Sequence, residues 1–178
     1  RTTERTPIKP AVVNDLRPGS APIRSEEMIA FFDKAIVQYQ AIANKGGWPQ
    51  VPGNRMMRPG DDDERLPVLR RRLRATGELK GSSSGFEDFN FDSTTEEAVR
   101  RFQERHGLRV SGRVDQPTLA ALNVSADQRL KQLELNRQRI FALLQQPIEE
   151  RYVLVNAPGF QLEAVERYEV AQRHRVVV

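Results

Sequence analysis

Residues 62–122 constrain the fold most, because apolar residues recur there at helical spacing in three short segments. Each segment carries one stripe of residues three or four apart: Leu66, Leu69 and Leu73, then Ala98, Val99 and Phe102, then Leu119 and Leu122. Helices this short bury such stripes against one another. The sequence therefore predicts a compact module with helices over about 62–76, 95–106 and 116–122, and it places Phe102 and Leu119 in the core.

Capping residues suggest where these helices begin. The acidic run 61–64 is expected to start the first helix, where the helix dipole favours negative charge. Thr94 and Glu97 have the spacing of a capping box for the second helix. Asp115 is expected to cap the third, with Pro117 in its first turn.

Longer elements flank the module. Ser25 offers an N-cap to a helix that Gly46-Gly47 ends, and a second long helix is expected over about 126–145. Beyond Pro147, a β-rich segment and an alternating segment surround a turn, which predicts a hairpin over about 151–165. The last residues, 175–178, suggest the start of a third strand.

We therefore expect a mainly α fold, with a three-helix module inside a helical scaffold and a short C-terminal β-hairpin. The expected domains are an extended segment over 1–24, a scaffold helix and loop over 25–60, the module over 61–124, a scaffold return helix over 125–147, and a β segment over 148–178.

Charge and composition limit the possible functions. The net charge is +4, but the densest basic cluster, Arg70-Arg71-Arg72 with Arg74, has helical spacing and is interpreted as a solvated helix face. No aromatic-plus-basic stripe accompanies it, which disfavours nucleic-acid binding. No apolar run is long enough for a membrane span. The chain has no cysteine, which excludes disulfides, thiolate metal sites and a cysteine nucleophile.

Metal and cofactor sites are not predicted. His106 and His174 lie far apart without adjacent acids, and His106 is expected instead to cap the end of its helix. The acidic run 61–64 lacks the alternating ligands and central glycine of a calcium loop. A glycosidase with paired carboxylates is a further possibility, but no acid is marked as paired.

Trp48 has two interpretations. Its indole can stack on the face of a sugar in a ligand groove, or it can pack beside Pro49 as an anchor of the scaffold. The second interpretation is favoured.

The string AVRRFQERHGLRVSGRVDQPTLAAL, residues 98–122, resembles the peptidoglycan-binding three-helix module of cell-wall enzymes, as do residues 69–73 and Gly77. This chain has Ser111-Gly112 where the module usually has Asp-Gly, and Asp115 where a second glycine is usual. The resemblance implies peptidoglycan as the partner. The candidate ligand residues surround the turn at 107–115, where basic side chains can meet peptide carboxylates: Arg105, Arg109, Ser111, Arg113, Asp115 and Gln116. The alternative is that these are ordinary solvated residues.

Four flanking segments are similar to the large L,D-transpeptidases of Gram-negative periplasms: Gly46-Gly47-Trp48-Pro49, the loop to Pro59-Gly60, residues 133–139 and residues 151–158. That family inserts the binding module in a helical scaffold, and a strand like Tyr152–Asn156 opens its catalytic β-domain. Its nucleophile is a cysteine in a Ser-His-Gly-Cys motif, which this chain lacks. The resemblance therefore implies a non-catalytic, truncated part of a periplasmic cross-linking enzyme.

Two functions from different classes remain open at this stage. The first is wall binding and scaffolding for a transpeptidase, and the second is a stand-alone structural or protein-interaction domain that binds no glycan. Truncation would leave strand edges such as Val176–Val178 without partners. We therefore expect the hairpin to be poorly ordered or to associate with another chain, so that an oligomer is possible.

Overall fold

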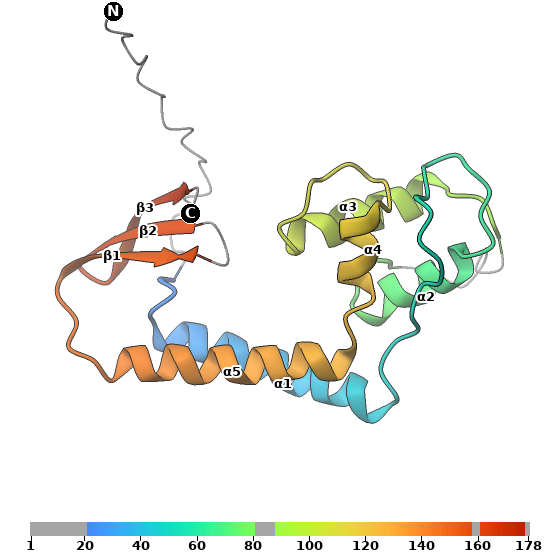
Figure 1. Ribbon diagram of the computed structural model, residues 1–178. Coiled ribbons are helices and arrows are strands. Elements are labelled where there is room, and N and C mark those ends of the chain that lie inside the picture. The colour runs from blue at the N-terminus through green and yellow to red at the C-terminus, as the bar shows by residue number, and fades with distance from the viewer. Residues whose placement is uncertain (1–20, 81–87, 158–160, 177–178) are drawn as a thin grey trace, which may run out of the picture. The chain divides into compact units, whose positions relative to one another are not determined.

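The computed structural model describes residues 21–80, 88–157 and 161–176 of the chain. Helices dominate these residues and a small antiparallel sheet follows them (Figure 1), so the predicted fold class is confirmed. The elements are α1 (Glu26–Asn44), α2 (Leu66–Ala75), α3 (Ser93–Arg105), α4 (Gln116–Leu122), α5 (Ala126–Leu144), β1 (Arg151–Asn156), β2 (Gln161–Glu166) and β3 (Glu169–Arg175). Most of the predicted N-terminal extended segment, the Gly81–Gly85 loop and the turn at 158–159 lie outside the described residues.

The chain divides into two compact units. One consists of residues 1–33 and 136–178, and the other of residues 34–135. Helices α1 and α5 contribute to both units, since each crosses the boundary between them. No helix among the described residues is long and apolar enough to cross a membrane.

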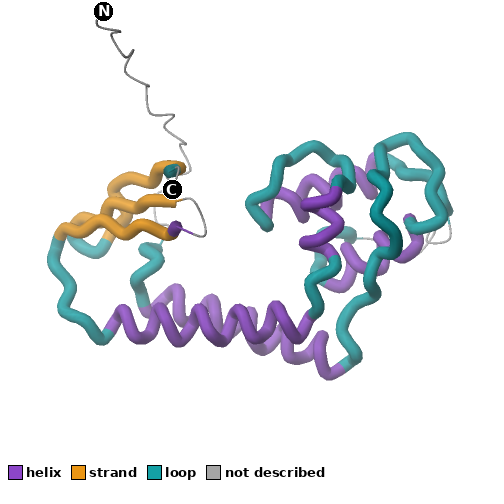
Figure 2. Tube along the Cα trace, viewed as in Figure 1, coloured by secondary structure: helices purple, strands orange, loops and turns teal. Residues whose placement is uncertain are grey.

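Helices α2, α3 and α4 enclose the core of the unit formed by residues 34–135, with long loops joining them (Figure 2). Phe102 is fully buried and Leu119 nearly so, as predicted. The core also takes in Val51 and Met57 from the loop that precedes α2. The packed module therefore begins before residue 61, because this loop closes one side of its core.

Helix α2 begins at Leu66, later than the acidic run suggests. Pro67 explains the difference, because proline lacks the backbone N–H and is tolerated only in the first turn of a helix. The preceding acids make other contacts. Asp62 forms a bridge with Asn90, and the carbonyl of Asp63 accepts a hydrogen bond from the N–H of Leu66.

Helix α3 is capped two residues earlier than predicted. Its N-cap is Asp92, whose Oδ1 accepts a hydrogen bond from the N–H of Thr95 at 2.8 Å. Thr94 lies inside the first turn, where a helical backbone cannot act as a cap, so the capping-box prediction is wrong. Asp115 does cap α4, since its Oδ1 accepts from both the N–H and the hydroxyl of Thr118.

The prediction of a solvated arginine face on α2 is wrong for two of its residues. Arg70 and Arg72 are only 4 % and 1 % exposed, whereas Arg71 between them is exposed. The guanidinium of Arg70 donates to the Thr95 hydroxyl at 3.0 Å and to the Asn90 carbonyl at 2.5 Å. Because α2 is covered on two sides, it buries more of its surface than its leucine stripe indicates.

The C-terminal sheet has the strand order β1-β2-β3, with both pairs antiparallel. The predicted hairpin is present, but the third strand begins at Glu169 rather than at 175. Arg167 and Tyr168 form the intervening turn with positive φ values of 51° and 68°. Hairpin turns of this kind usually contain glycine or asparagine, so nothing in the sequence marks this one. The sheet is paired within the chain, against the expectation of a poorly ordered hairpin, and association with another chain stays a prediction.

A buried glutamate ties the start of the described chain to this sheet. Glu163 in the central strand is 1 % exposed, and its Oε1 accepts a hydrogen bond from the N–H of Ile23 at 2.8 Å. Arg173 on β3 donates to the carbonyl of Ala21 at 2.9 Å and lies 3.3 Å from the Glu163 carboxylate. The segment before α1 is therefore held on one face of the sheet.

Candidate functional site

A hollow gathers several of the predicted ligand residues on the surface of the module. It has a volume of about 390 Å³, within the range of small-ligand sites. We call it the arginine hollow, and its lining residues are Met56, Arg100, Arg109, Val110, Ser111, Arg113 and Asp115. Four of the six predicted residues are thus brought together: Arg109, Ser111, Arg113 and Asp115.

A second hollow adjoins the first along the chain and contains a fifth predicted residue, Gln116. We call it the amide hollow, and it is lined by Asn54, Gln116, Pro117, Leu119, Ala120 and Asn123. The two hollows share no lining residue, but each has one wall from the loop before α2 and one from the start of α4. Asn54 and Gln116 line the amide hollow, and Met56 and Asp115 line the arginine hollow.

The turn that carries Arg109 and Arg113 is organised by Gln103, which is fully buried on α3. Its Oε1 accepts hydrogen bonds from the N–H groups of Ser111 and Gly112 at 2.9 and 3.0 Å. Its Nε2 donates to the carbonyl of Arg113 at 2.8 Å. One amide therefore satisfies three backbone groups of the turn, which fixes the position of the neighbouring side chains.

Gly112 is required at the centre of this turn. Its φ of +74° belongs to the left-handed region, and a Cβ there would lie 2.7 Å from Cγ of Glu96. Glu96 forms an ion pair with Arg100 at 2.6 Å, and Arg100 lines the arginine hollow. The glycine thus lets the turn pass directly against this ion pair.

The opposite wall, the loop over 51–57, is held at both ends. The N–H of Val51 donates to Oδ1 of Asn123 at 2.8 Å, and Nδ2 of Asn123 donates back to the Val51 carbonyl at 2.9 Å. Met57 and Val114 exchange two backbone hydrogen bonds, of 3.1 and 3.0 Å. The wall is therefore set by the fold before any ligand binds, and that lowers the entropic cost of binding.

The arginine hollow has an excess of positive charge. Within the described part of the chain, the guanidinium groups of Arg109 and Arg113 make no hydrogen bond or ion pair. Arg100 is neutralised by Glu96, and Asp115 uses Oδ1 to cap α4. The two unpaired guanidinium groups are thus available to an anionic ligand, and planar guanidinium groups suit carboxylates best.

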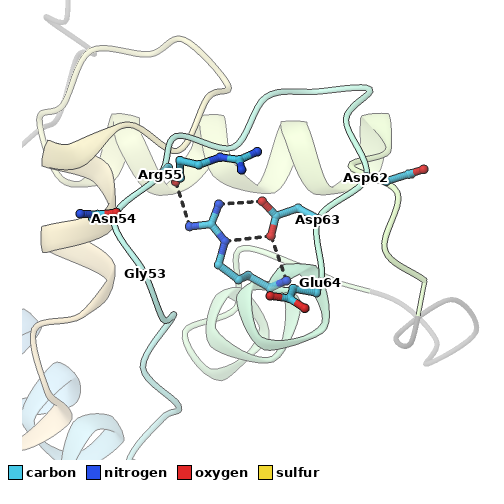
Figure 3. A pocket seen from close by; sticks show the side chains of 7 residues that line it. Gly53, Asn54, Arg55, Asp62, Asp63 and Glu64 are labelled. Atoms are coloured by element: carbon cyan, nitrogen blue, oxygen red, sulfur yellow. Dashed lines mark hydrogen bonds and ion pairs between the residues drawn. The ribbon is translucent and has the colours of Figure 1, made fainter.

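A third hollow, lined by Gly53, Asn54, Arg55 and residues 62–65, is acidic but is not arranged as a cation site. Figure 3 shows the carboxylate of Asp63 joined by dashed lines to a guanidinium, which is that of Arg65, whereas the carboxylates of Asp62 and Glu64 point elsewhere. Arg65 contacts Asp63 at 2.8 and 2.6 Å and donates to the carbonyl of Arg55 at 2.8 Å. This pair lowers the pKa of Asp63 and anchors the loop. No three metal-ligand side chains converge anywhere in the described residues.

Arg105, the sixth predicted residue, does not line either ligand hollow. Its guanidinium donates to the hydroxyl of Tyr39 at 3.1 Å and forms an ion pair with buried Glu78. These contacts join α3 to α1 within the same unit. A ligand role for Arg105 stays a prediction, while its observed role is structural.

Trp48 is a buried anchor, as favoured by the sequence analysis. It is 8 % exposed, and its indole N–H donates to the carbonyl of Val124 at 3.0 Å. The guanidinium of Arg72 lies 3.9 Å from the centroid of its ring, and burial lowers the pKa of Arg72 to about 10. The indole face is therefore occupied by Arg72 and is not available to a sugar.

His106 caps the C-terminal end of α3, as predicted. It is the C-cap residue, and its Nδ1 lies 2.8 Å from the carbonyl of Phe102, which places the ring proton on Nδ1. Burial, with smaller contributions from the charges of Arg105 and Arg129, lowers the pKa of His106 to about 4. The ring is thus neutral over the ordinary pH range.

The sequence did not predict Met56, Arg100 and Val110 in the arginine hollow, nor the organising role of Gln103. Arg100 and Gln103 both belong to the 98–122 string, where Gln103 follows core residue Phe102 on the buried side of α3. Gln103 is a polar residue at a core position of the helix, and this feature could have indicated its structural role. Met56 comes from a loop outside the string, and no local pattern connects it to the turn.

Residues 63–122 match the family described as "Putative peptidoglycan binding domain". The matched segment contains α2, α3 and α4 and all six predicted ligand residues, whereas Asn54, Met56 and Asn123 of the two hollows lie outside it. It therefore marks a peptidoglycan-binding domain within the chain. No curated protein matches the chain.

Proposed function

We propose that this chain is the wall-binding and scaffold portion of an L,D-transpeptidase of the Gram-negative periplasm, and that its arginine hollow contacts peptidoglycan. The main support for a binding role is that the matched domain contributes to a preformed hollow, which contains two unpaired guanidinium groups. Peptidoglycan carries carboxylates on its peptides, so the charge of the hollow suits the polymer. The chain itself contains no cysteine and supplies no thiolate nucleophile.

The transpeptidase context rests on the flanking segments. Trp48 and Pro49, which belong to one of the resembling segments, are separated from the end of α1 by three residues. The indole of Trp48 contacts Val124, just before α5. A binding module held between two long helices is the arrangement expected of an inserted domain. In this proposal the sheet β1-β2-β3 belongs to the beginning of the catalytic β-domain.

Wall binding is tested by sedimenting the 178-residue chain with purified insoluble sacculi over a series of salt concentrations. We expect retention that persists at about 0.15 M salt, where the Debye length is about 8 Å and diffuse attraction is screened. The variant Arg109→Gln/Arg113→Gln should lose most of this retention. Arg71→Gln, which removes an exposed charge on α2, should leave it unchanged.

Two results would contradict the proposal. Retention that disappears with modest salt, or an equal loss in Arg71→Gln, would show that only the net charge of +4 causes adhesion. The chain would then be better described as a structural or protein-interaction domain. The transpeptidase context is tested separately, by sequencing the gene beyond the codon for Val178 for an in-frame Ser-His-Gly-Cys motif.

A further inference from the structure

We infer that the arginine hollow and the amide hollow form one continuous site for a peptide that ends in a free carboxylate beside a small aliphatic side chain. This inference rests on the proposed function and names the part of the polymer that is bound. It assigns recognition to the stem peptide that ends in alanine, and it excludes the glycan strand as the determinant.

The arginine hollow combines charge with apolar surface. Arg109 and Arg113 offer unpaired guanidinium groups, while Val110 and Met56 line the same hollow with 48 % and 43 % of their surface exposed. A carboxylate held by the arginines would place an adjacent methyl group against these apolar side chains, removing them from water. A terminal alanine carries both groups on the same carbon atom.

The amide hollow suits the uncharged part of such a peptide. Pro117, Leu119 and Ala120 give it an apolar floor, and it contains no charged side chain. Asn123 is engaged with Val51, so the polar groups left for a ligand are those of Asn54 and Gln116. Side-chain amides both donate and accept, as a peptide backbone requires of its partners.

The lining of both hollows argues against glycan recognition. Neither hollow has an aromatic side chain among its lining residues. Trp48 and Tyr39 contact each other edge to face with ring centroids 5.8 Å apart, and Arg72 covers the indole. The two hollows therefore offer no aromatic ring on which a sugar could stack, whereas the unpaired guanidinium groups of Arg109 and Arg113 can bind a carboxylate.

Competition with three soluble probes tests the inference. The full chain is bound to sacculi and then challenged with a stem tetrapeptide ending in D-alanine, with the C-terminal amide of that peptide, or with glycan strands stripped of peptide. We expect the acid to displace the chain and the amide to be roughly tenfold weaker, since a charge-assisted hydrogen bond contributes about that factor. The stripped glycan should displace nothing.

Variants locate the two parts of the site. Arg113→Gln should reduce the preference for the acid over the amide, because it removes one of the two guanidinium groups that discriminate between them. Gln116→Ala should weaken both peptides by the same factor and keep the preference. Arg71→Gln should change neither, and circular dichroism of each variant verifies that the chain is folded.

Each outcome separates this inference from the proposed function. Sacculus binding that the glycan displaces, or that acid and amide displace equally, would overturn the peptide assignment and leave wall binding intact. An unchanged acid preference in Arg113→Gln would also overturn it. Absence of binding to sacculi and to the tetrapeptide would overturn both.

Discussion

The guanidinium of Arg72 lies 3.9 Å from the centroid of the Trp48 ring, and its Nε donates to the carbonyl of Leu122 at 2.7 Å. One buried cation thereby joins α2 to the end of α4 and to the loop that follows α1. Nη1 of the same side chain donates to the hydroxyl of Thr76 at 2.9 Å. Burial of a charge is costly unless its donors are satisfied, and these contacts offset that cost.

We expect Arg72→Lys to destabilise the chain by about 1–3 kcal/mol, because an ammonium cannot reproduce the planar stacking and the fork of donors. Trp48 is the single tryptophan, so its fluorescence reports this contact directly. The emission should shift to longer wavelength as water reaches the indole. Arg71→Lys at the exposed neighbouring position is the control, and an equal effect in both variants would refute the role of the stack.

The low pKa of His106 predicts a specific loss of stability in acid. Its folded-state pKa is about 4 and the ordinary value is 6.5. Between these values the unfolded chain binds a proton that the folded ring does not, so the free energy of unfolding falls as the pH decreases from 6.5 to 4. The contribution is about 2 kcal/mol, allowing for screening at a partly exposed ring.

Denaturant titrations at pH 7 and pH 4.5 measure this contribution when wild type is compared with His106→Gln. The carboxylates titrate in both proteins and cancel in the comparison. The wild type should lose more stability than the variant over this range. Parallel curves would show that the His106 pKa is not shifted.

Replacing Gln103 with leucine should destabilise the chain by about 2–4 kcal/mol, since it leaves three backbone groups of the 111–113 turn unpaired in a buried position. Sacculus binding should weaken as well, because the turn positions Arg109 and Arg113. Urea denaturation and sedimentation measure the two effects. Gln138→Leu, at an exposed position of α5, should have little effect on either.

Gly112→Ala should cost more than Gly107→Ala, although both glycines have positive φ. A Cβ at Gly107 meets nothing within 4 Å, so that variant reports backbone strain alone, about 1 kcal/mol. At Gly112 the added Cβ collides with Glu96 and displaces its ion pair with Arg100. Thermal unfolding of the two variants gives the difference, and equal costs would contradict the close approach.

In the sheet-containing unit, Glu163→Ala should release the segment before α1. The variant removes the acceptor for the N–H of Ile23 and the partner of Arg173. Trypsin should then cleave after Arg24 faster than in wild type, as detected by mass spectrometry. Glu166→Ala on the same strand removes only a surface pair with Arg151 and should leave cleavage unchanged.

Several features of this fold followed from local patterns. The leucine stripe of α2, the cap at Asp115 and the end of α3 at His106 depend on residues within one or two turns of one another. Local errors had local causes as well. Pro67 delays the start of α2, and Asp92 caps α3 ahead of Thr94, because proline chemistry and an available carboxylate outweigh a generic preference for acids or threonine at a helix start.

Only part of the candidate site could be predicted from the sequence. The string at 98–122 placed Arg109, Ser111, Arg113 and Asp115 near one turn, and the structure brings them to one hollow. Met56, in contrast, reaches that hollow only because residue 57 pairs with Val114, far along the chain. Sequence spacing carries no information about a pairing between distant segments.

By itself, the sequence determined the fold class, the apolar cores of the short helices and the presence of a hairpin, since these depend on periodicity and on capping groups close in the chain. The tertiary structure alone decided that Arg70 and Arg72 are buried while Arg71 is exposed, and that Arg105 contacts Tyr39 rather than the hollow. The sequence does not show whether a charged side chain is buried. Whether it meets water or a carbonyl depends on which distant backbone packs beside it, and only the folded chain fixes that.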